Sequence, residues 1–361
     1  MLFLSAILVV LFPVTLAAPF TEPSHVARRA PLGSARSGKT IPGQYIVKFK
    51  DSASSDAVLS AANGKLKPSH VFKGPFKGFA GHLDAASLDA IRKLPEVEFI
   101  EEDAVITLAD DLTVPGTGTG TAPRAIVTQA GAPWNLARLS NPTPGSNIYR
   151  YDSSAGAGTC SYVIATGIQV THTQFGGRAI FGANFAGDGS NTDGDGNGHG
   201  TNIAGIIGST SYGVARQTRL IAVKVLNAAA HSQLSWRCRA SITLGGSASA
   251  AINTAVRNLV LGNVFVAVSS GTNNATIATS PANEPLACTV GSTTQANGTL
   301  TSAAFGAAHV AGLGAYLLGL PSSLTGSGLC AHMQSIAIPG VLTGVPPNTV
   351  NLLAHNGWDL P

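Results

Sequence analysis

The residues with the clearest potential for chemistry lie in one glycine-rich stretch, residues 195–201, which contains His199. A histidine can serve as the general base of an acyl transfer when a nucleophile and an orienting carboxylate lie beside it. Small neighbours let a substrate backbone approach closely, and the N-terminus of a helix expected over 201–207 favours the neutral, basic ring. The alternative interpretation is a polar residue that only caps this helix.

The elements that must position His199 belong to a pattern of short apolar runs and helical segments in the C-terminal part of the chain. We expect strands at 162–165, 220–226 and 264–268, and helices at 201–207, 248–261 and 308–318. Strands separated by helices predict an α/β fold with a parallel sheet and helices on both faces. Ligand chemistry in such sheets lies outside the carboxyl ends of the strands.

A smaller pattern precedes this one and predicts an α+β domain over 41–109. We expect its strands at 45–49, 76–83 and 97–101, and its helices at 52–63 and at 84–94, the latter with Asp84 as N-cap. Residues 18–40, rich in Pro, Ser and Arg, and residues 110–127, with Gly-Thr repeats, are expected to be linkers. Residues 128–361 then form the α/β domain.

The first residues carry a targeting pattern. An apolar run over 1–16 ends in small residues, which predicts a signal peptide over 1–17; the alternative is a buried helix. No later segment is long and apolar enough to cross a membrane, so we expect a soluble, secreted protein without a membrane partner.

The composition narrows the function classes. Only 11% of the residues are charged and 42 are glycine, which favours a compact globular protein over a disordered one. The net charge of +4 is scattered along the chain rather than gathered in a basic stripe with aromatic residues. We therefore expect no nucleic-acid partner.

The chain has four cysteines, Cys160, Cys238, Cys288 and Cys330. An even number in an oxidising compartment predicts two disulfides, with three possible connectivities. No CxxC spacing occurs, which argues against a zinc site. Asn274 and Asn297 begin Asn-X-Thr triplets and are candidate glycosylation sites.

Several segments in order resemble the subtilisin-like serine proteases of the proteinase K type, as secreted by fungi. The segments are the histidine motif at 195–201 and those at 132–138, 211–215, 280–285 and 348–354. Residues 45–47 and 99–103 likewise resemble the start and the end of that family's inhibitor-type propeptide.

The resemblance implies a monomeric secreted endopeptidase, made as a zymogen and acting on protein or peptide substrates. Its own propeptide would occupy the cleft and be cut within 110–127. It also implies that Cys160 pairs with Cys238 and that Cys288 pairs with Cys330.

The chain departs from the family at the residues that His199 needs. The family has an orienting Asp where this chain has Ala165, which cannot accept a hydrogen bond from the histidine ring. A gapless comparison places Ala304 at the nucleophilic serine, and Ser302 is the nearest replacement. Asp193 and Asp195 are the candidate substitutes for the orienting carboxylate because they are close in sequence, but they precede His199 in a Gly-rich turn, which disfavours the geometry of a triad. The expected site is therefore a retained general base without its partners.

The remaining cleft residues are retained in part. The oxyanion donor of the family is an Asn, where this chain has Thr272, with Asn273 as the alternative donor. The two peptide-binding walls would bind substrate by strand addition. The resemblance assigns to them Ser232, Leu234, Thr243, Leu244, Gly245 and Gly246.

Two blocks of the family pattern are missing, near 236–239 and near 305–306. The first loss would remove a helix and leave apolar surface on one sheet face. The second would remove the serine and part of a calcium site. The run 188–197 lacks the closing glutamate of an EF-hand loop, so we expect neither a metal nor another cofactor.

Three functions follow as hypotheses. The chain is a subtilisin-like endopeptidase by family; it is an inactive pseudoenzyme or the product of mis-splicing; or its propeptide binds, inhibits or chaperones related proteases.

Overall fold

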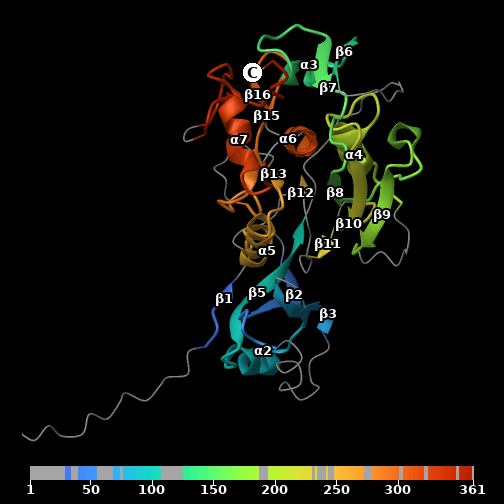
Figure 1. Cartoon of the computed structure of the whole chain (residues 1–361). Coiled ribbons are helices and arrows are strands. Elements are labelled where there is room, and N and C mark those ends of the chain that lie inside the picture. The colour runs from blue at the N-terminus through green and yellow to red at the C-terminus, as the bar shows by residue number, and fades with distance from the viewer. Residues whose placement is uncertain are drawn as a thin grey trace, which may run out of the picture.

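A computed structural model shows two units, an N-terminal unit within residues 29–106 and a C-terminal unit within residues 125–359 (Figure 1). It describes residues 29–33, 40–54, 68–73, 76–106, 125–186, 194–229, 232–233, 241–242, 248–271, 279–300, 304–320, 324–346 and 349–359. The expected signal peptide lies outside the described residues, as does most of the expected helix at 52–63.

The N-terminal unit is a mostly antiparallel sheet with one helix. Its elements are β1 (Leu32–Gly33), β2 (Thr40–Phe49), β3 (Pro68–Lys73), β4 (Lys77–His82), α2 (Ala85–Arg92) and β5 (Val97–Ile106). The strand order is β1-β5-β2-β4-β3, and only β1 joins in parallel. The three expected strands and the expected helix at 84–94 are confirmed, whereas β3 was not expected because its sequence lacks a clear alternation.

Helix α2 begins where its sequence predicts. The Asp84 carboxylate accepts a hydrogen bond from the Ser87 amide at 2.7 Å and so caps the first turn. Ile91 packs from this helix against Val47, Phe79 and Ile100 of the sheet. This face of the sheet is covered within the N-terminal unit itself.

The C-terminal unit is built on a six-stranded parallel sheet of order β14-β13-β12-β8-β10-β9. The strands are β8 (Cys160–Ala165), β9 (Ala179–Asn184), β10 (Arg219–Lys224), β12 (Ser241–Ile242), β13 (Ala267–Ser269) and β14 (Cys288–Val290). The expected parallel α/β sheet is confirmed, although β13 is shorter than the strand expected at 264–268.

Helices cover both faces of this sheet. Along β8, Val163 packs against α4 (His199–Gly208), whereas Ile164 belongs to the cluster that contains α5 (Ala250–Leu261). Helix α6 (Ala304–Leu318) contacts α4 and so shares its face. We call the α4–α6 side the first face and the α5 side the second face. All three expected helices are confirmed, and α6 begins four residues before the expected start at 308.

Shorter elements complete the C-terminal unit. They are β6 (Ile126–Ala130), α3 (Trp134–Leu139), β7 (Ile148–Asp152), η1 (Thr173–Phe175), β11 (Ser232–Gln233), β15 (Ser292–Thr293), β16 (Thr299–Leu300), α7 (Leu329–Ile336), β17 (Ile338–Pro339) and β18 (Leu352–Leu353). Among the described residues, no helix has the length and apolar character needed to cross a membrane.

Candidate active site

His199 is the first residue of α4, and the loop before it is held by the carboxylate of Asp195. One Asp195 oxygen accepts hydrogen bonds from the Thr166 hydroxyl at 2.7 Å and the Gly198 amide at 2.8 Å. The other accepts from the amide and the hydroxyl of Thr201, at 2.7 and 2.6 Å. Asp195 therefore ties the end of β8 to the first turn of α4.

These contacts decide the role of Asp195. Burial by itself would raise the pKa of its carboxyl, but hydrogen bonds from Thr201 and Thr166 hold the pKa below its usual value. Both oxygens are engaged in capping the helix, so the carboxylate is committed to the backbone around His199. The geometry therefore favours a capping role for Asp195 over the alternative that it orients the histidine.

Ala165 lies at the carboxyl end of β8, directly beside the helix that carries His199. Its side chain is fully buried, and its carbonyl accepts hydrogen bonds from the amides of Val225 and Leu226. A Cβ atom on Gly200 would lie 3.2 Å from the Ala165 methyl group. A side chain at this position can thus approach the first turn of α4, but a methyl group offers no hydrogen-bond acceptor.

The start of α6 lies on the other side of His199. The ring of Phe305 lies 6.0 Å from the His199 ring, centroid to centroid. Ala304, the first residue of α6, is fully buried. The helix N-terminus next to the histidine therefore presents Ala304 and Phe305, neither of which is a nucleophile. Ser302 lies outside the described residues.

A second histidine of the same region has a structural role. His309 of α6 lies within hydrogen-bonding distance of Asn135, 2.7 Å from its amide nitrogen, and of the Phe305 carbonyl, at 2.6 Å. Burial lowers its pKa, so its ring is neutral at physiological pH. His309 thus fastens α6 to α3.

The two strand-addition walls are described only in small part. Ser232 and Gln233 form β11, which pairs antiparallel with Ile106 and Val105 at the end of β5. The edge at which substrate was expected is therefore paired with the N-terminal unit. The predictions for Thr272, Asn273, Leu234, Thr243, Leu244, Gly245, Gly246 and Asn274 lie outside the described residues.

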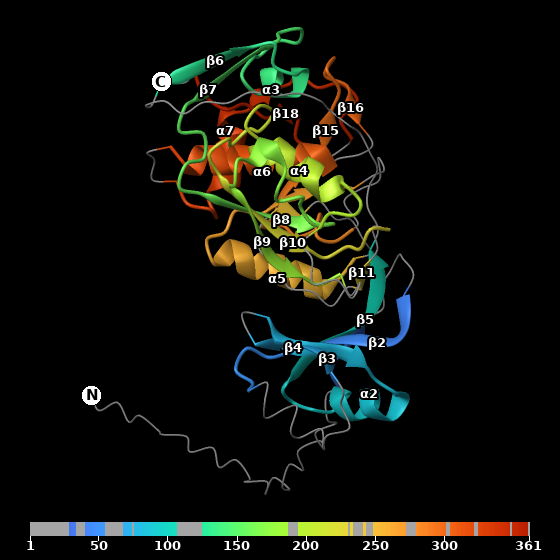
Figure 2. The ribbon, with the colours of Figure 1, turned by 90° about the vertical axis from the view of Figure 1, so that its right-hand side faces the viewer.

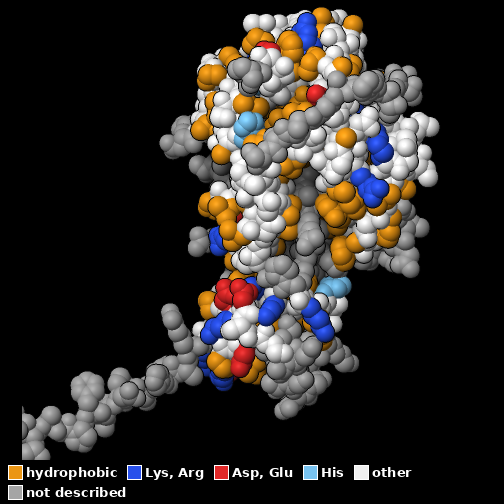
Figure 3. Space-filling view, in the orientation of Figure 1, with side chains coloured by type: hydrophobic (Ala, Val, Ile, Leu, Met, Phe, Trp, Pro, Cys, Tyr) orange, Lys and Arg blue, Asp and Glu red, His pale blue; other side chains and the backbone are white. Residues whose placement is uncertain are grey.

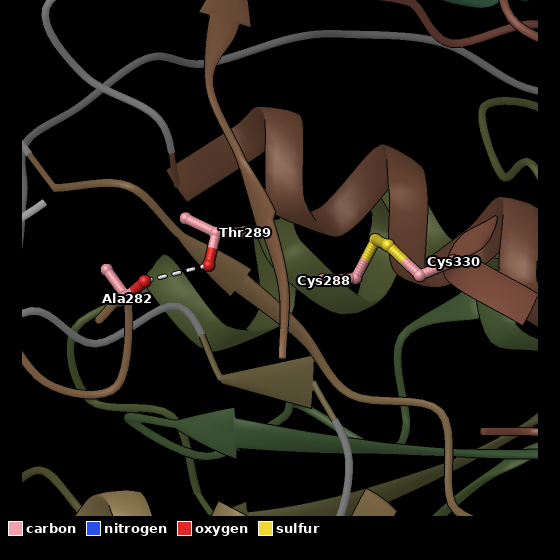
Figure 4. Close-up of a disulfide and its surroundings, with 4 residues drawn as sticks. All are labelled: Ala282, Cys288, Thr289 and Cys330. Carbon is pink, nitrogen blue, oxygen red and sulfur yellow. Dashed lines mark hydrogen bonds between the residues drawn. A yellow bond between two sulfur atoms is a disulfide. The ribbon is translucent and has the colours of Figure 1, made fainter. Parts of the chain in front are cut away.

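Cys288 of β14 and Cys330 of α7 form a disulfide, as the family resemblance implied (Figure 4). Beside it, the Thr289 hydroxyl donates to the Ala282 carbonyl at 2.9 Å, which anchors the same strand. Cys160 is a free, exposed cysteine, which differs from the expected pairing with Cys238. Cys238 lies outside the described residues.

Asn297, a candidate glycosylation site, has its side chain in a hydrogen-bond pair. Its amide oxygen accepts from the Arg138 guanidinium at 3.2 and 3.0 Å. Arg138 is almost fully buried, so this bond satisfies a charge inside the fold. Glycosylation of Asn297 stays a prediction.

Within the described part of the chain, no three His, Cys, Asp or Glu side chains come together as a metal-binding group. The absence of a metal stays a prediction, because the run 187–193 is outside that part.

A parallel α/β unit that pairs through β11 with a preceding α+β domain is the arrangement expected of the class of proteases that carry an inhibitory propeptide. The family comparisons agree with this class. The model of the peptidase inhibitor I9 family matches residues 44–109. The subtilisin-like serine protease AsES of Sarocladium strictum is 39% identical, with 98% of both chains covered. The cuticle-degrading protease of Metarhizium anisopliae is 38% identical, covering 98% of this chain and 99% of that protein.

This chain belongs to the subtilisin-like serine protease family. Proteinase R of Parengyodontium album is 37% identical over 91% of the chain and 92% of that protein, so the proteinase K-type resemblance is confirmed. The crystal structure of a cold-adapted subtilisin-like serine proteinase superposes with a TM-score of 0.58 at 27% identity, covering 63% of this chain and 99% of that one.

The alignment with the Sarocladium protease extends over 409 positions, 48 more than the 361 residues of this chain. Because the alignment covers nearly the whole of both chains, these unmatched positions lie inside it.

Proposed function

We propose that this chain is a member of the subtilisin-like serine protease family that does not hydrolyse peptide bonds. The observation that carries the proposal is Ala165, a buried methyl group at the position beside α4 where the family has its orienting carboxylate. Loss of that carboxylate lowers the rate by about four orders of magnitude in enzymes that keep the other triad members. Asp195 is engaged with Thr166, Gly198 and Thr201 and so is not available to replace it.

The N-terminus of α6 adds to this argument. It lies near His199 through Phe305 and begins with Ala304, so the first turn of this helix offers no hydroxyl for the histidine to activate. The alignment with the Sarocladium protease contains internal positions that have no counterpart in this chain. This supports the interpretation that the segment bearing the serine is one of the missing blocks. A histidine without a nucleophile has nothing to activate.

Covalent labelling tests the proposal directly. The full chain is incubated with a fluorophosphonate probe and with a peptide ester, beside an active protease of the family. We expect no labelling and no ester hydrolysis above the buffer rate. Labelling that disappears in the Ser302→Ala variant would refute the proposal and identify Ser302 as a replacement nucleophile.

The second candidate function is binding to related proteases, and the I9 match over 44–109 favours it. In the intact chain β5 pairs with β11, so we expect inhibition of an active relative only by the N-terminal segment expressed without residues 125–361, in preparations that circular dichroism shows to be folded. Equal inhibition by the intact chain would show that the domain is free to act in trans. Failure of both preparations to inhibit would remove this candidate.

We further propose that residues 1–17 direct secretion of a monomer that needs no metal. The apolar run at 1–16 supports the first part. N-terminal sequencing of protein from the culture medium tests it, and a chain that still begins at Met1 would contradict it.

A further inference from the structure

The sheet of the N-terminal unit is buried on both faces, and its two faces pack against different partners. One face carries Val47, Phe79 and Ile100 and is covered by α2. The opposite face carries Ile46 and Ala80, which are paired across β2 and β4, together with Phe72 and Phe76. These four side chains are between 1% and 6% exposed. No helix of the N-terminal unit among the described residues covers them.

The partner of this second set is the C-terminal unit. Ile46, Phe72, Phe76 and Ala80 form one continuous hydrophobic cluster with residues on the second face of the parallel sheet and on α5. The members from the sheet and its continuing loops include Ile164, Val223, Val225 and Val268, and those from α5 include Val256 and Val260. Figure 2 shows α5 between the parallel sheet and the sheet of the N-terminal unit. The two units therefore share one core.

Polar contacts fix the same arrangement. Glu101 of β5 is 3% exposed, and its carboxylate accepts a hydrogen bond from the Ala251 amide at 3.1 Å, in the first turn of α5. On the C-terminal side of Glu101, β5 continues into its ladder with β11. The Glu101 contact with α5, the β5–β11 pairing and the apolar cluster thus hold neighbouring elements of the two units together.

The second face is exposed where this shared core ends. In the parallel sheet, the register aligns Tyr162 with Ile221, and Ile221 with Ile180. Tyr162 and Ile221 are only half-buried and Ile180 is 40% exposed, whereas Ile164 and Val223 in the next row are 2% and 7% exposed. Figure 3 shows apolar side chains on the surface over β9 and β10. No other described layer of the chain covers this row.

We propose that the N-terminal unit is a permanent layer of the core in this chain rather than a removable propeptide. Its apolar face covers the part of the second face that α5 leaves open, so separating the two units would expose Ile46, Phe72 and Phe76 on one side and Ile164 and Val223 on the other. Burial of such side chains stabilises the folded chain in proportion to the apolar area removed from water. This contribution opposes separation of the two units. The two units then fold and unfold together.

Cutting the connection tests the proposal. A recognition sequence for a site-specific protease is placed within residues 110–121 of the full chain, and the purified protein is cut completely. We expect both fragments to elute together in size-exclusion chromatography at micromolar concentration and to separate only in denaturant. Elution of the C-terminal fragment alone would overturn the proposal.

Tryptophan fluorescence gives an independent readout, because Trp134, Trp236 and Trp358 all lie after residue 125 and the N-terminal unit has none. We expect Phe72→Ala to lower the midpoint of the tryptophan transition by about 5–10 °C. The matched control is Val71→Ala on the same strand, where the side chain is 37% exposed and a shift of about 1 °C or less is expected.

The proposal would be overturned if the tryptophan transition of Phe72→Ala stayed at the temperature of the unchanged chain while circular dichroism showed a separate transition at a lower temperature. Phe72→Leu provides a milder variant if Phe72→Ala does not fold. Neither readout involves hydrolysis, so an active chain would refute the proposed function without affecting this result.

Discussion

The two faces of the parallel sheet are completed in different ways. The first face is covered by α4 and α6, which come from the C-terminal unit itself. The second face is covered by α5 together with the strands of the N-terminal unit. The first face carries His199, and the second carries the contact between the two units.

This difference separates two kinds of requirement. A hydrophobic layer needs apolar side chains of suitable shape, and a neighbouring domain can supply them, as Phe72 and Phe76 do on the second face. Catalysis on the first face needs one acceptor atom at one place, and the methyl group of Ala165 has none. We therefore expect that a neighbouring domain can replace a missing hydrophobic layer, whereas no neighbouring surface can replace a missing acceptor atom.

The largest expected effect concerns the disulfide that holds α7 to the edge of the sheet. The bond closes a loop of 42 residues, so replacing Cys288 and Cys330 together by alanine should lower the free energy of unfolding by about 4 kcal/mol. Urea denaturation measures this loss. Cys160→Ala is the control and should change stability by about 0.5 kcal/mol or less. A loss of several kcal/mol in the control would show that Cys160 is paired with Cys238 after all.

The first face should be sensitive to a single added methyl group. A Cβ atom on Gly200 would lie 2.0 Å from the Gly167 carbonyl oxygen, so Gly200→Ala should cost about 3 kcal/mol. Gly205 of the same helix has no atom within 4 Å of such a Cβ, and Gly205→Ala should instead stabilise the chain by about 0.5–1 kcal/mol. Thermal unfolding of both variants measures the contrast, and equal effects would contradict this packing.

The Asp195 cap should make the first face sensitive to acid. Its pKa is held below the usual value of 3.8, so its stabilising contribution is complete above that value and is lost as the pH falls through the lowered pKa. Asp195→Asn should cost about 1–2 kcal/mol at pH 7, and this cost should shrink progressively as the pH falls below 3.8. Denaturation at a series of pH values measures this, and a cost that does not change with pH would exclude the charged cap.

The smallest of these effects is expected at the carboxyl group of Glu101, and it has the opposite sign. Burial raises the pKa of Glu101 above the usual value of 4.5, and nearby Asp103 adds to the shift. The ionised form is therefore unfavourable in the folded state, and this cost disappears as the pH falls through the raised pKa toward 4.5. Glu101→Gln should raise stability at pH 8 by about 1 kcal/mol and flatten the pH dependence. Lower stability at pH 8 would contradict the sign.

Much of the fold follows from local patterns. The strands at 162–165 and 220–226 are visible in the sequence as short, almost continuous apolar runs, and the helix at 248–261 as a longer helical stretch. Strand β3 was not expected, because only Phe72 in it is buried and its sequence does not alternate. The start of α6 at Ala304 was not predicted from the sequence, because the alanine and glycine residues of its first turns carry little periodic signal.

The candidate site was predictable only in its residue types. The missing acceptor at Ala165 and the missing nucleophile near Ala304 follow from the family pattern. Contacts between β8, α4 and α6, which are far apart in sequence, bring Ala165 against the first turn of α4 and Phe305 beside His199. The capping role of Asp195 had a signal, an acidic residue shortly before a predicted helix, but the Thr166 hydroxyl that completes it lies 29 residues away.

The sequence by itself therefore determined the family and most of the order of strands and helices, and it predicts the loss of two triad members, because these depend on residue type and short-range spacing. Only the tertiary structure decided that Asp195 is used as a cap and that the N-terminal unit shares a core with the second face. Both depend on which distant surfaces meet, and residues with the same local pattern can meet different partners. The apolar face of β2, β3 and β4 looks the same in sequence whether it faces solvent, a helix or another sheet, and here it covers a neighbour that lacks a layer of its own.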